Sequence, residues 1–209
     1  MIGGHSRNIG KTSVVEGIIR AFPGCDWTAV KITQFGHGVC SVNGETCGCS
    51  VAEHQFALTE EKQNDSGTDT SRFLAAGAKR SLWVRTKQGE LFTALPSLKK
   101  SIEADDFVIC ESNSLRRFMK PDVYLQVLDP SNLDFKSSAQ EFFDLADAYV
   151  VVQSGEPLQS DPWQNVSLKR EIEKNKPLFI VSAEDRFLNE GLIEFVAQAA
   201  SLRYDRIAK

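Results

Sequence analysis

The sequence predicts an α/β protein of the phosphate-loop NTPase class, a three-layer sandwich in which helices cover both faces of a mostly parallel sheet. Two observations support this prediction. A glycine-containing stretch near the start ends in Gly-Lys-Thr-Ser and runs into an amphipathic segment. Short apolar segments then alternate with amphipathic ones along the chain, as expected for parallel strands joined by helices.

The segment 4–13 has the composition of a loop that binds phosphate. Backbone N–H groups of such a loop surround nucleotide phosphates at a helix N-terminus, the lysine reaches the terminal phosphates, and the next hydroxyl holds Mg²⁺. Lys11 and Thr12 take those two roles here. The other residues expected to contact the nucleotide are Gly4, Ser6, Arg7, Asn8, Ile9, Gly10 and Ser13. Neither His5 nor Ser6 is expected to act as a catalyst.

The loop departs from the common spacing, since five residues rather than four separate Gly4 from Gly10. A Gly-Lys-Thr triplet also occurs by chance. The following sequence argues against chance, because apolar residues recur at helical spacing until Pro23-Gly24 ends the run: Val14, Val15, Ile18, Ile19 and Phe22. Only Met1 and Ile2 precede Gly3, so the strand that feeds the loop is either unusually short or cut off by a truncated or misplaced start. We expect the latter.

The remaining elements follow in order. Residues 27–32 form a predicted strand, and 33–67 form a long, mostly irregular loop that is functional or mobile, with one helix at 50–58 whose Ser50 and Glu53 are spaced as a capping box. We expect further helices at 70–76, 91–104 (broken at Pro96), 135–146, 166–174 and 190–202. We expect further strands at 82–85, 107–110, 123–128, 149–152 and 178–181.

Composition limits the possible functions. A chain of 209 residues with 42% apolar residues is one globular domain spanning residues 1–209. The net charge of −4 gives no reason to expect a nucleic acid or an anionic membrane as partner. No apolar run is long enough to span a membrane, and no signal peptide is recognisable. The odd number of five cysteines suits a reducing cytoplasm better than a disulfide framework.

The phosphate loop, Lys31, Glu111 and Ser154 are expected near the carboxyl ends of strands, where ligands bind in parallel sheets. Glu111 follows the strand 107–110 and can bind Mg²⁺ or position an attacking water; the alternative is a solvated strand end. Asp69 opens a helix and is either an N-terminal cap or a second Mg²⁺ ligand. Lys31 is either an ordinary edge charge or a second cation that faces phosphate.

The long loop contains His37, Cys40, Cys47 and Cys49, followed by His54. Three thiols and an imidazole can supply four tetrahedral ligands to Zn²⁺. The alternatives are a flexible loop with incidental thiols and a reversible disulfide between Cys47 and either Cys49 or Cys40. The choice between GTP and ATP is open, because no Asn-Lys-x-Asp motif follows the strand 149–152.

Three blocks of sequence resemble a known family. They are Ile-Gly-Lys-Thr-Ser at 9–13, Val-Lys-Ile at 30–32 and Thr-Asp-Thr-Ser-Arg-Phe-Leu-Ala-Ala-Gly-Ala at 68–78. Together they are similar to the MobB-type adapter proteins of molybdopterin-guanine dinucleotide biosynthesis. The longer phosphate loop is similar to that of dethiobiotin synthetase, in the same branch of phosphate-loop NTPases as the metallochaperone GTPases. Ser112-Asn113-Ser114 replaces the family's glycine after the strand-end glutamate.

The resemblance implies a cytoplasmic, Mg²⁺-dependent nucleotide-binding homodimer with weak NTPase activity and a partner enzyme in molybdenum-cofactor biosynthesis. It implies that Lys11 and Thr12 hold phosphate and Mg²⁺, that Asp69 and Glu111 are acidic Mg²⁺ partners, and that Lys11 and Glu111 are the catalytic candidates. Two alternatives remain. One is a metal-delivery GTPase with the cysteine loop as its cargo site, and the other is an ATP-dependent ligase like dethiobiotin synthetase.

Overall fold

A computed structural model describes residues 1–35, 55–132, 134–153, 176–184 and 186–207. Its strands are β1 (Ile2–Gly4), β2 (Thr28–Phe35), β3 (Phe56–Glu60), β4 (Arg80–Lys87), β5 (Val108–Glu111), β6 (Leu125–Leu128), β7 (Ala148–Gln153) and β8 (Leu178–Ser182). Its helices are α1 (Lys11–Ala21), α2 (Asp69–Ala75), α3 (Leu91–Ile102), α4 (Ser137–Gln140) and α6 (Glu190–Ile207). Short 3₁₀ turns cover Pro23–Cys25, Ser114–Arg117 and Phe143–Leu145.

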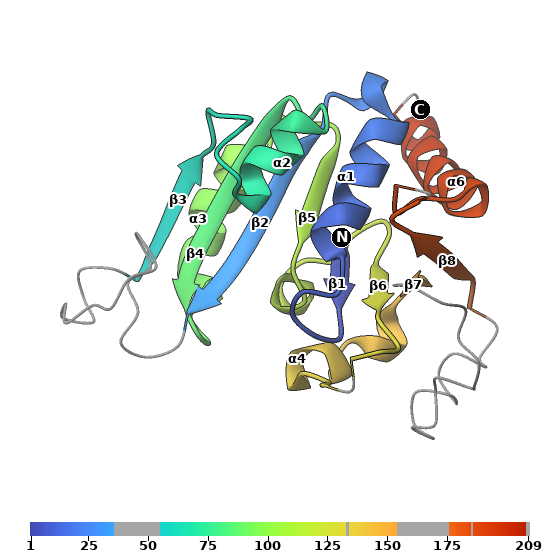
Figure 1. Ribbon diagram of the computed structural model, residues 1–209. Coiled ribbons are helices and arrows are strands. Elements are labelled where there is room, and N and C mark those ends of the chain that lie inside the picture. The colour runs from blue at the N-terminus through green and yellow to red at the C-terminus, as the bar shows by residue number, and fades with distance from the viewer. Residues whose placement is uncertain (36–54, 133, 154–175, 185, 208–209) are drawn as a thin grey trace.

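The strands form one sheet in the order β3-β4-β2-β5-β1-β6-β7-β8 (Figure 1). All neighbouring pairs are parallel except β3 and β4, which run antiparallel at one edge. The short strand β1 therefore lies at the centre of the sheet, between β5 and β6. This arrangement confirms the predicted α/β architecture with a mostly parallel sheet.

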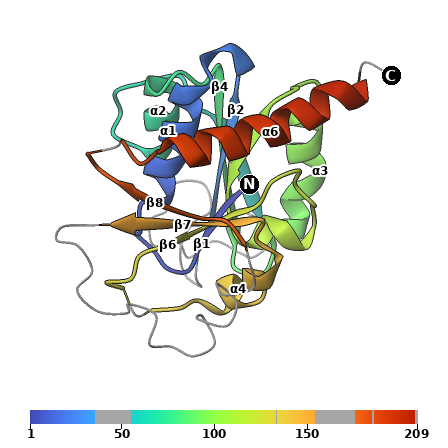
Figure 2. The same cartoon turned by 90° about the vertical axis from the view of Figure 1, so that its right-hand side faces the viewer.

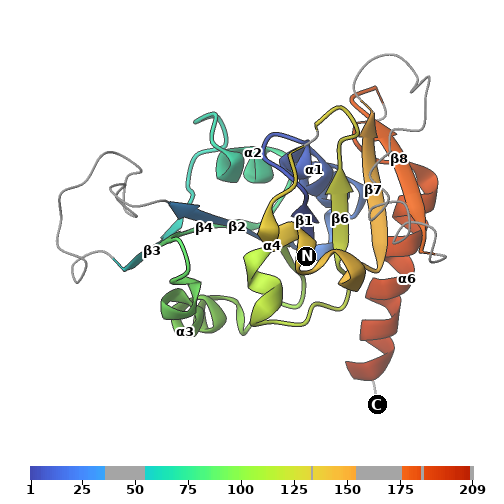
Figure 3. The same ribbon diagram turned by 90° about the horizontal axis from the view of Figure 1, so that it is seen from below.

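Helices cover both faces of the sheet (Figures 1 and 2). One face packs against α1, α2 and α6, and the opposite face packs against α3. Neighbouring residues of a strand point to opposite faces of the sheet: Ala29 packs in the core under α1, α2 and α6, and Val30 packs in the core under α3. Seen from below, α1 and α2 lie on one side of the sheet and α3 on the other (Figure 3). Because both faces are covered, the open approach to the sheet is at the ends of its strands.

Several predicted elements are confirmed, including the helices that begin near Thr70 and at Glu190. The predicted helix at 50–58 is wrong where it can be compared, because Phe56–Glu60 is a strand. Its residues pair with β4, whose outer edge gains backbone hydrogen bonds that a helix would not supply. The segment 33–67 is thus less irregular than expected, since β2 also continues to Phe35. The predicted capping box lies outside the described residues.

Two other helix predictions need correction. Residues 135–146 do not form one helix but the short helix α4 and a 3₁₀ turn at Phe143–Leu145. The buried rings of Phe142 and Phe143 pack with Tyr149 in a core cluster, and this tertiary contact overrides helical periodicity. Conversely, α3 is continuous across Pro96. Proline has no amide hydrogen, so one carbonyl in the preceding turn lacks its helical partner. Because Pro96 is exposed, that carbonyl lies on the solvent side of the helix. The helix predicted at 166–174 lies outside the described residues.

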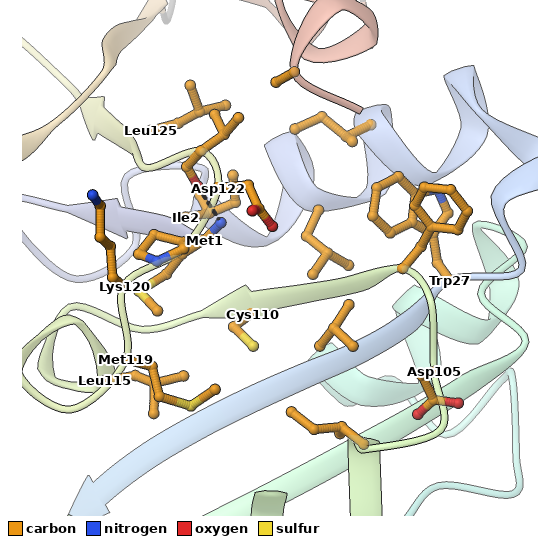
Figure 4. Close-up of a pocket in the computed structure, with 18 of the residues that line it drawn as sticks. Met1, Ile2, Trp27, Asp105, Cys110, Leu115, Met119, Lys120, Asp122 and Leu125 are labelled. Atoms are coloured by element: carbon orange, nitrogen blue, oxygen red, sulfur yellow. Dashed lines mark hydrogen bonds between the residues drawn. The ribbon is translucent and has the colours of Figure 1, made fainter. Parts of the chain in front are cut away.

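A cavity of about 500 Å³ lies beside Met1, at the amino ends of β1, β5 and β6 (Figure 4). Its lining is mostly apolar and includes Ile2, Trp27, Cys110 and Leu115. The ammonium group of Met1 donates a hydrogen bond to the Val123 carbonyl at 2.7 Å, and burial lowers its pKa. Burial also raises the pKa of the Cys110 thiol to about 11. The cavity therefore offers apolar contact rather than a site for phosphate chemistry.

None of the described helices is both long enough and apolar enough to cross a bilayer.

Candidate functional site

The predicted phosphate loop connects β1 to α1 and ends in an open helix N-terminus. Gly10 caps this helix with φ of 86°, a left-handed conformation that glycine adopts without strain, and among the described residues no side-chain cap hydrogen bond occupies the helix end. The first amide groups of α1 are therefore available to an anion. The loop opens on a cavity of about 1100 Å³ that is lined by residues from Ser6 to Ser13.

Lys11 extends back along the loop. Its ammonium group donates a hydrogen bond to the Ser6 carbonyl at 2.6 Å, so the side chain already follows the path that a phosphate-binding lysine needs. Its pKa is lowered to about 8, mainly because burial removes water from the charged form, and the nearby Lys136 and Lys31 add to the effect while Glu111 opposes it. No ion pair with Lys11 occurs among the described residues. An incoming polyphosphate would supply the missing negative charge.

A side-chain clamp fixes the point at which β1 opens into the loop. The Gly4 amide donates to the Asn113 side-chain oxygen, and the Asn113 amide donates to the Gly4 carbonyl, both at 2.8 Å. A Cβ atom on Gly4 would lie 2.6 Å from the Lys11 side chain. Gly4 does not line the cavity itself but lets Lys11 pass close to the backbone. Asn113 lies two residues after the strand-end glutamate, and no motif in the sequence identifies it as a partner of Gly4.

Four residues that line the cavity contact one another: Thr12, Lys31, Asp69 and Glu111. The Thr12 hydroxyl donates to Glu111 Oε2 at 2.8 Å. The Lys31 ammonium contacts Glu111 Oε1 at 2.6 Å and Asp69 Oδ2 at 2.7 Å. Lys31 and Glu111 are direct neighbours on parallel strands, and Asp69 is the first residue of α2. The sequence predicted Lys31 at a strand end, but β2 continues to Phe35 and Lys31 lies within it. The structure nevertheless brings Lys31, Asp69 and Glu111 to one place.

The charges of this group support one another. Burial of Lys31 favours its neutral form, but the carboxylates of Glu111 and Asp69 more than compensate, so the pKa of Lys31 is raised. Burial likewise opposes ionisation of Asp69, yet its contacts with Lys31 and the charge of Arg72 lower its pKa. Lys31 is therefore a charged partner of both acids rather than an ordinary edge charge.

Arg72 ties α2 to the first turns of α1. Its guanidinium contacts Glu16 at 2.6 Å and donates to the Ser13 hydroxyl at 3.1 Å. Glu16 also pairs with Arg20, at 2.8 Å. The Asp-Thr-Ser-Arg block thus places Asp69 in the site and uses Arg72 to hold its helix there. In the sequence, Asp69 is singled out by its position at a helix start, whereas Arg72 appears only within the block that resembles a known family.

Lys136 is a further cation of the cavity that sequence analysis missed. Its amide donates to the His5 carbonyl at 2.9 Å, which anchors the segment before α4 to the phosphate loop. Burial, together with the charges of Arg7 and Lys31, lowers the pKa of Lys136, although Asp134 opposes this. No motif identifies this lysine, because it reaches the loop from a separate part of the chain.

The remaining loop residues divide into buried and exposed ones. The Ile9 side chain is 1% exposed and belongs to the core, so only its backbone faces the cavity. His5 is buried against Phe135, and one of its ring nitrogens lies 3.0 Å from the Asn132 carbonyl oxygen. Ser6 donates to Asp134 at 3.0 Å. Arg7 and Asn8 are exposed at the cavity rim, and Asn8 has φ of 56°.

Other predicted sites are only partly described. His37, Cys40, Cys47, Cys49 and His54 lie outside the described residues, as does Ser154. The described part of the loop after β8 approaches the start of α1, and the Phe187 ring lies 3.7 Å from where a Cβ on Gly10 would be. This loop is therefore near the phosphate loop.

The site suits Mg²⁺ by the chemistry of its oxygen atoms. In the described part of the chain no three His, Cys, Asp or Glu side chains gather as a metal cluster. The Thr12 hydroxyl and the carboxylates of Glu111 and Asp69 are nevertheless the hard oxygen ligands that Mg²⁺ uses, directly or through water, alongside nucleotide phosphates. Both carboxylates presently contact Lys31, so a metal ion would replace that ammonium as their partner.

Comparison with solved structures identifies the fold. HypB from Helicobacter pylori, whose crystal structure was determined in complex with nickel, superposes with a TM-score of 0.54. The alignment covers 97% of this chain and 87% of HypB at 16% sequence identity. The chain has the P-loop NTPase fold. No family model and no curated protein sequence matches it.

Proposed function

We propose that the protein binds a nucleoside triphosphate together with Mg²⁺ and hydrolyses it slowly. The observation that carries the proposal is the hydrogen bond between the Thr12 hydroxyl and Glu111, next to Lys11 at an uncapped helix N-terminus. A hydroxyl, a carboxylate and a lysine at the start of such a helix are the components of a metal–triphosphate site.

Each residue has a distinct task in this proposal. The amides of the first turn of α1 bind phosphate oxygens, and Lys11 exchanges the Ser6 carbonyl for the terminal phosphates. Thr12 and Glu111 hold Mg²⁺, which neutralises charge on the phosphates. The Glu111 carboxyl group accepts the Thr12 hydroxyl, and a carboxylate in this position can also accept a hydrogen bond from an attacking water and orient it. Lys136 adds positive charge to the same cavity.

The test is equilibrium binding of fluorescent GTP and ATP analogues with Mg²⁺ present. Lys11→Ala removes the ammonium group that reaches the phosphates, so it should weaken both affinities by about 100-fold, the effect of losing a charge-assisted contact. The matched control is Lys100→Ala, which removes an exposed lysine from α3 and should leave affinity unchanged. Unchanged affinity of a folded Lys11→Ala variant for both nucleotides would refute the proposal.

The finer proposal is a MobB-type adapter that binds GTP or ATP and acts with a nucleotidyltransferase in molybdenum-cofactor biosynthesis. Its support is the family resemblance of the blocks at 9–13, 30–32 and 68–78, all of which contribute residues to the cavity. Two of these, Lys31 and Asp69, contact each other there. Co-purification of a nucleotidyltransferase, lost in Lys11→Ala, supports this role. A requirement for a small carboxylic acid in phosphate release would instead favour a ligase.

A second candidate is metal delivery. The fold similarity to a nickel-bound HypB structure and the cysteine loop of the sequence favour it. We propose Cys40, Cys47 and Cys49, with His37, as ligands for Zn²⁺ or Ni²⁺. Elemental analysis of protein purified without a histidine tag should find about one metal per chain or dimer, and a triple Cys→Ser variant should lack it. Metal-free wild-type protein that also fails to bind added Zn²⁺ or Ni²⁺ would remove this candidate.

Light scattering with and without nucleotide tests the expected homodimer.

A further inference from the structure

Lys31 lies on the same side of the sheet as the phosphate loop and reaches both acidic residues of the site. It belongs to β2, in direct register with Glu111 of β5. Its side chain is 17% exposed, and the Glu111 side chain is 3% exposed. The ammonium bridges Glu111 and Asp69 at 2.6 Å and 2.7 Å. Without a cation between them, two ionised carboxylates in this confined space would repel each other.

The same two carboxylates are the acidic groups available to a divalent cation beside Thr12. Each Glu111 oxygen already has one partner, since Oε2 accepts from Thr12 and Oε1 accepts from Lys31. A divalent ion and the Lys31 ammonium would compete for the same negative charge. Divalent ions at a two-carboxylate site bind weakly when a fixed ammonium has already neutralised that charge.

We propose that Lys31 is an internal counter-ion that keeps divalent cations out of the nucleotide-free site. This inference rests on the proposed function, because the metal is expected to arrive with a triphosphate. The metal then replaces the ammonium beside Glu111 and Asp69, while the phosphates become the new partner of the ammonium. No covalent bond is formed or broken in this exchange; only the ionic partners change.

This exchange couples metal to nucleotide. A metal alone must displace Lys31 without offering it another anion, and a nucleotide alone adds phosphate charge next to Glu111. When both arrive together, every charge has a partner. By thermodynamic reciprocity, each should raise the affinity of the other. If the ion pair only joined β2, β5 and α2 and did not exchange partners, the metal and the nucleotide would not raise each other's affinity through Lys31.

The direct test is Mn²⁺ binding to the full chain without nucleotide, followed by the loss of the free-ion electron paramagnetic resonance signal. Lys31→Met removes the ammonium but keeps an apolar side chain of similar length. We expect this variant to bind Mn²⁺ about tenfold or more tightly than wild type, with about one site per chain. Adding Glu111→Gln should abolish the gain.

Lys136→Met is the matched control, because it removes a second cation from the same cavity. In the described part of the chain Lys136 forms no ion pair with either acid, so its loss should give much the smaller gain. Equal gains in Lys31→Met and Lys136→Met would reduce the effect to general electrostatics and overturn the inference.

A second variant guards against poor folding. Lys31→Gln keeps a hydrogen-bond donor and removes the charge, and Mn²⁺ should raise its melting temperature more than that of wild type. No Mn²⁺ effect in a folded Lys31 variant, with Mg²⁺-dependent nucleotide binding intact in wild type, overturns this inference alone. Absence of nucleotide binding in wild type, with the Mn²⁺ gain present, overturns the proposed function alone.

Discussion

Substitution of Gly3 by alanine tests the packing that supports the phosphate loop. A Cβ atom on Gly3 would lie 2.4 Å from the Tyr124 hydroxyl oxygen and 2.5 Å from both the Asn113 and the Gln126 side-chain oxygens. Tyr124 and Gln126 are completely buried, and the tyrosine donates to the glutamine at 2.7 Å. Neither can move into solvent to make room. The adjustment falls on Asn113, which would lose its two hydrogen bonds to Gly4.

The size of the effect follows from these contacts. Overpacking a closed core costs about 1–3 kcal/mol, and a buried polar group left without a partner costs about 1–3 kcal/mol. We expect Gly3→Ala to lower the free energy of unfolding by about 3 kcal/mol, which corresponds to a fall of about 6–12 °C in melting temperature for a chain of this size.

Urea unfolding followed by circular dichroism measures this change. Gly24→Ala is the matched control, because no atom lies within 4 Å of its added Cβ and its φ is not positive. The control should stay within about 0.5 kcal/mol of wild type. If Gly3→Ala changed the free energy of unfolding as little as the control, that result would contradict the close packing around β1 and the Asn113 clamp.

Three further predictions concern the site. Gly4→Ala would place its Cβ 2.6 Å from the Lys11 side chain and 2.9 Å from the buried Ile9 side chain, so nucleotide affinity should fall about tenfold or more and the melting temperature should fall as well; normal affinity by fluorescence titration would contradict this. Protonated Lys11 is the form that pairs with phosphate, and its pKa of about 8 means that affinity should fall about tenfold per pH unit above pH 8 and level off below it. A flat profile from pH 7 to about 10 would show that Lys11 does not titrate in this range. Arg72→Ala should lower the free energy of unfolding by about 1 kcal/mol, a modest loss because Arg72 is partly exposed and Glu16 keeps Arg20, and Arg72→Lys should restore only part of it in urea unfolding.

The parts of the fold that the sequence predicted correctly depend on local signals. The Gly-Lys-Thr-Ser stretch specifies a loop and the start of a helix within a few residues, and α1 begins at Lys11 as expected. Apolar runs such as Tyr149–Val152 fall in strands because a strand buried on both faces has no polar positions. Asp69 and Glu111 lie at element ends as predicted, whereas Lys31 lies within β2 and reaches them because it is in register with Glu111.

The errors and omissions involve contacts between distant segments. Phe56–Glu60 carries no local feature that separates an edge strand from a helix, and only pairing with β4 decides it. Phe142 and Phe143 end a helical pattern because both rings are needed in a core formed with Tyr149. Asn113 holds Gly4 across more than one hundred residues of sequence, so no spacing rule relates the two. Lys136 likewise contacts the loop from a distant part of the sequence, through the hydrogen bond that its amide donates to the His5 carbonyl.

The measurement that tests the central claim most directly is the affinity of the wild-type protein for GTP and ATP, by isothermal titration calorimetry, in Mg²⁺ and in EDTA. Thr12 and Glu111 are proposed to hold a metal that neutralises phosphate charge, so we predict saturable binding of at least one nucleotide that is about tenfold or more tighter with Mg²⁺. Absence of binding to either nucleotide, or equal affinity in Mg²⁺ and EDTA, would contradict the assignment of this cavity as a Mg²⁺–nucleotide site.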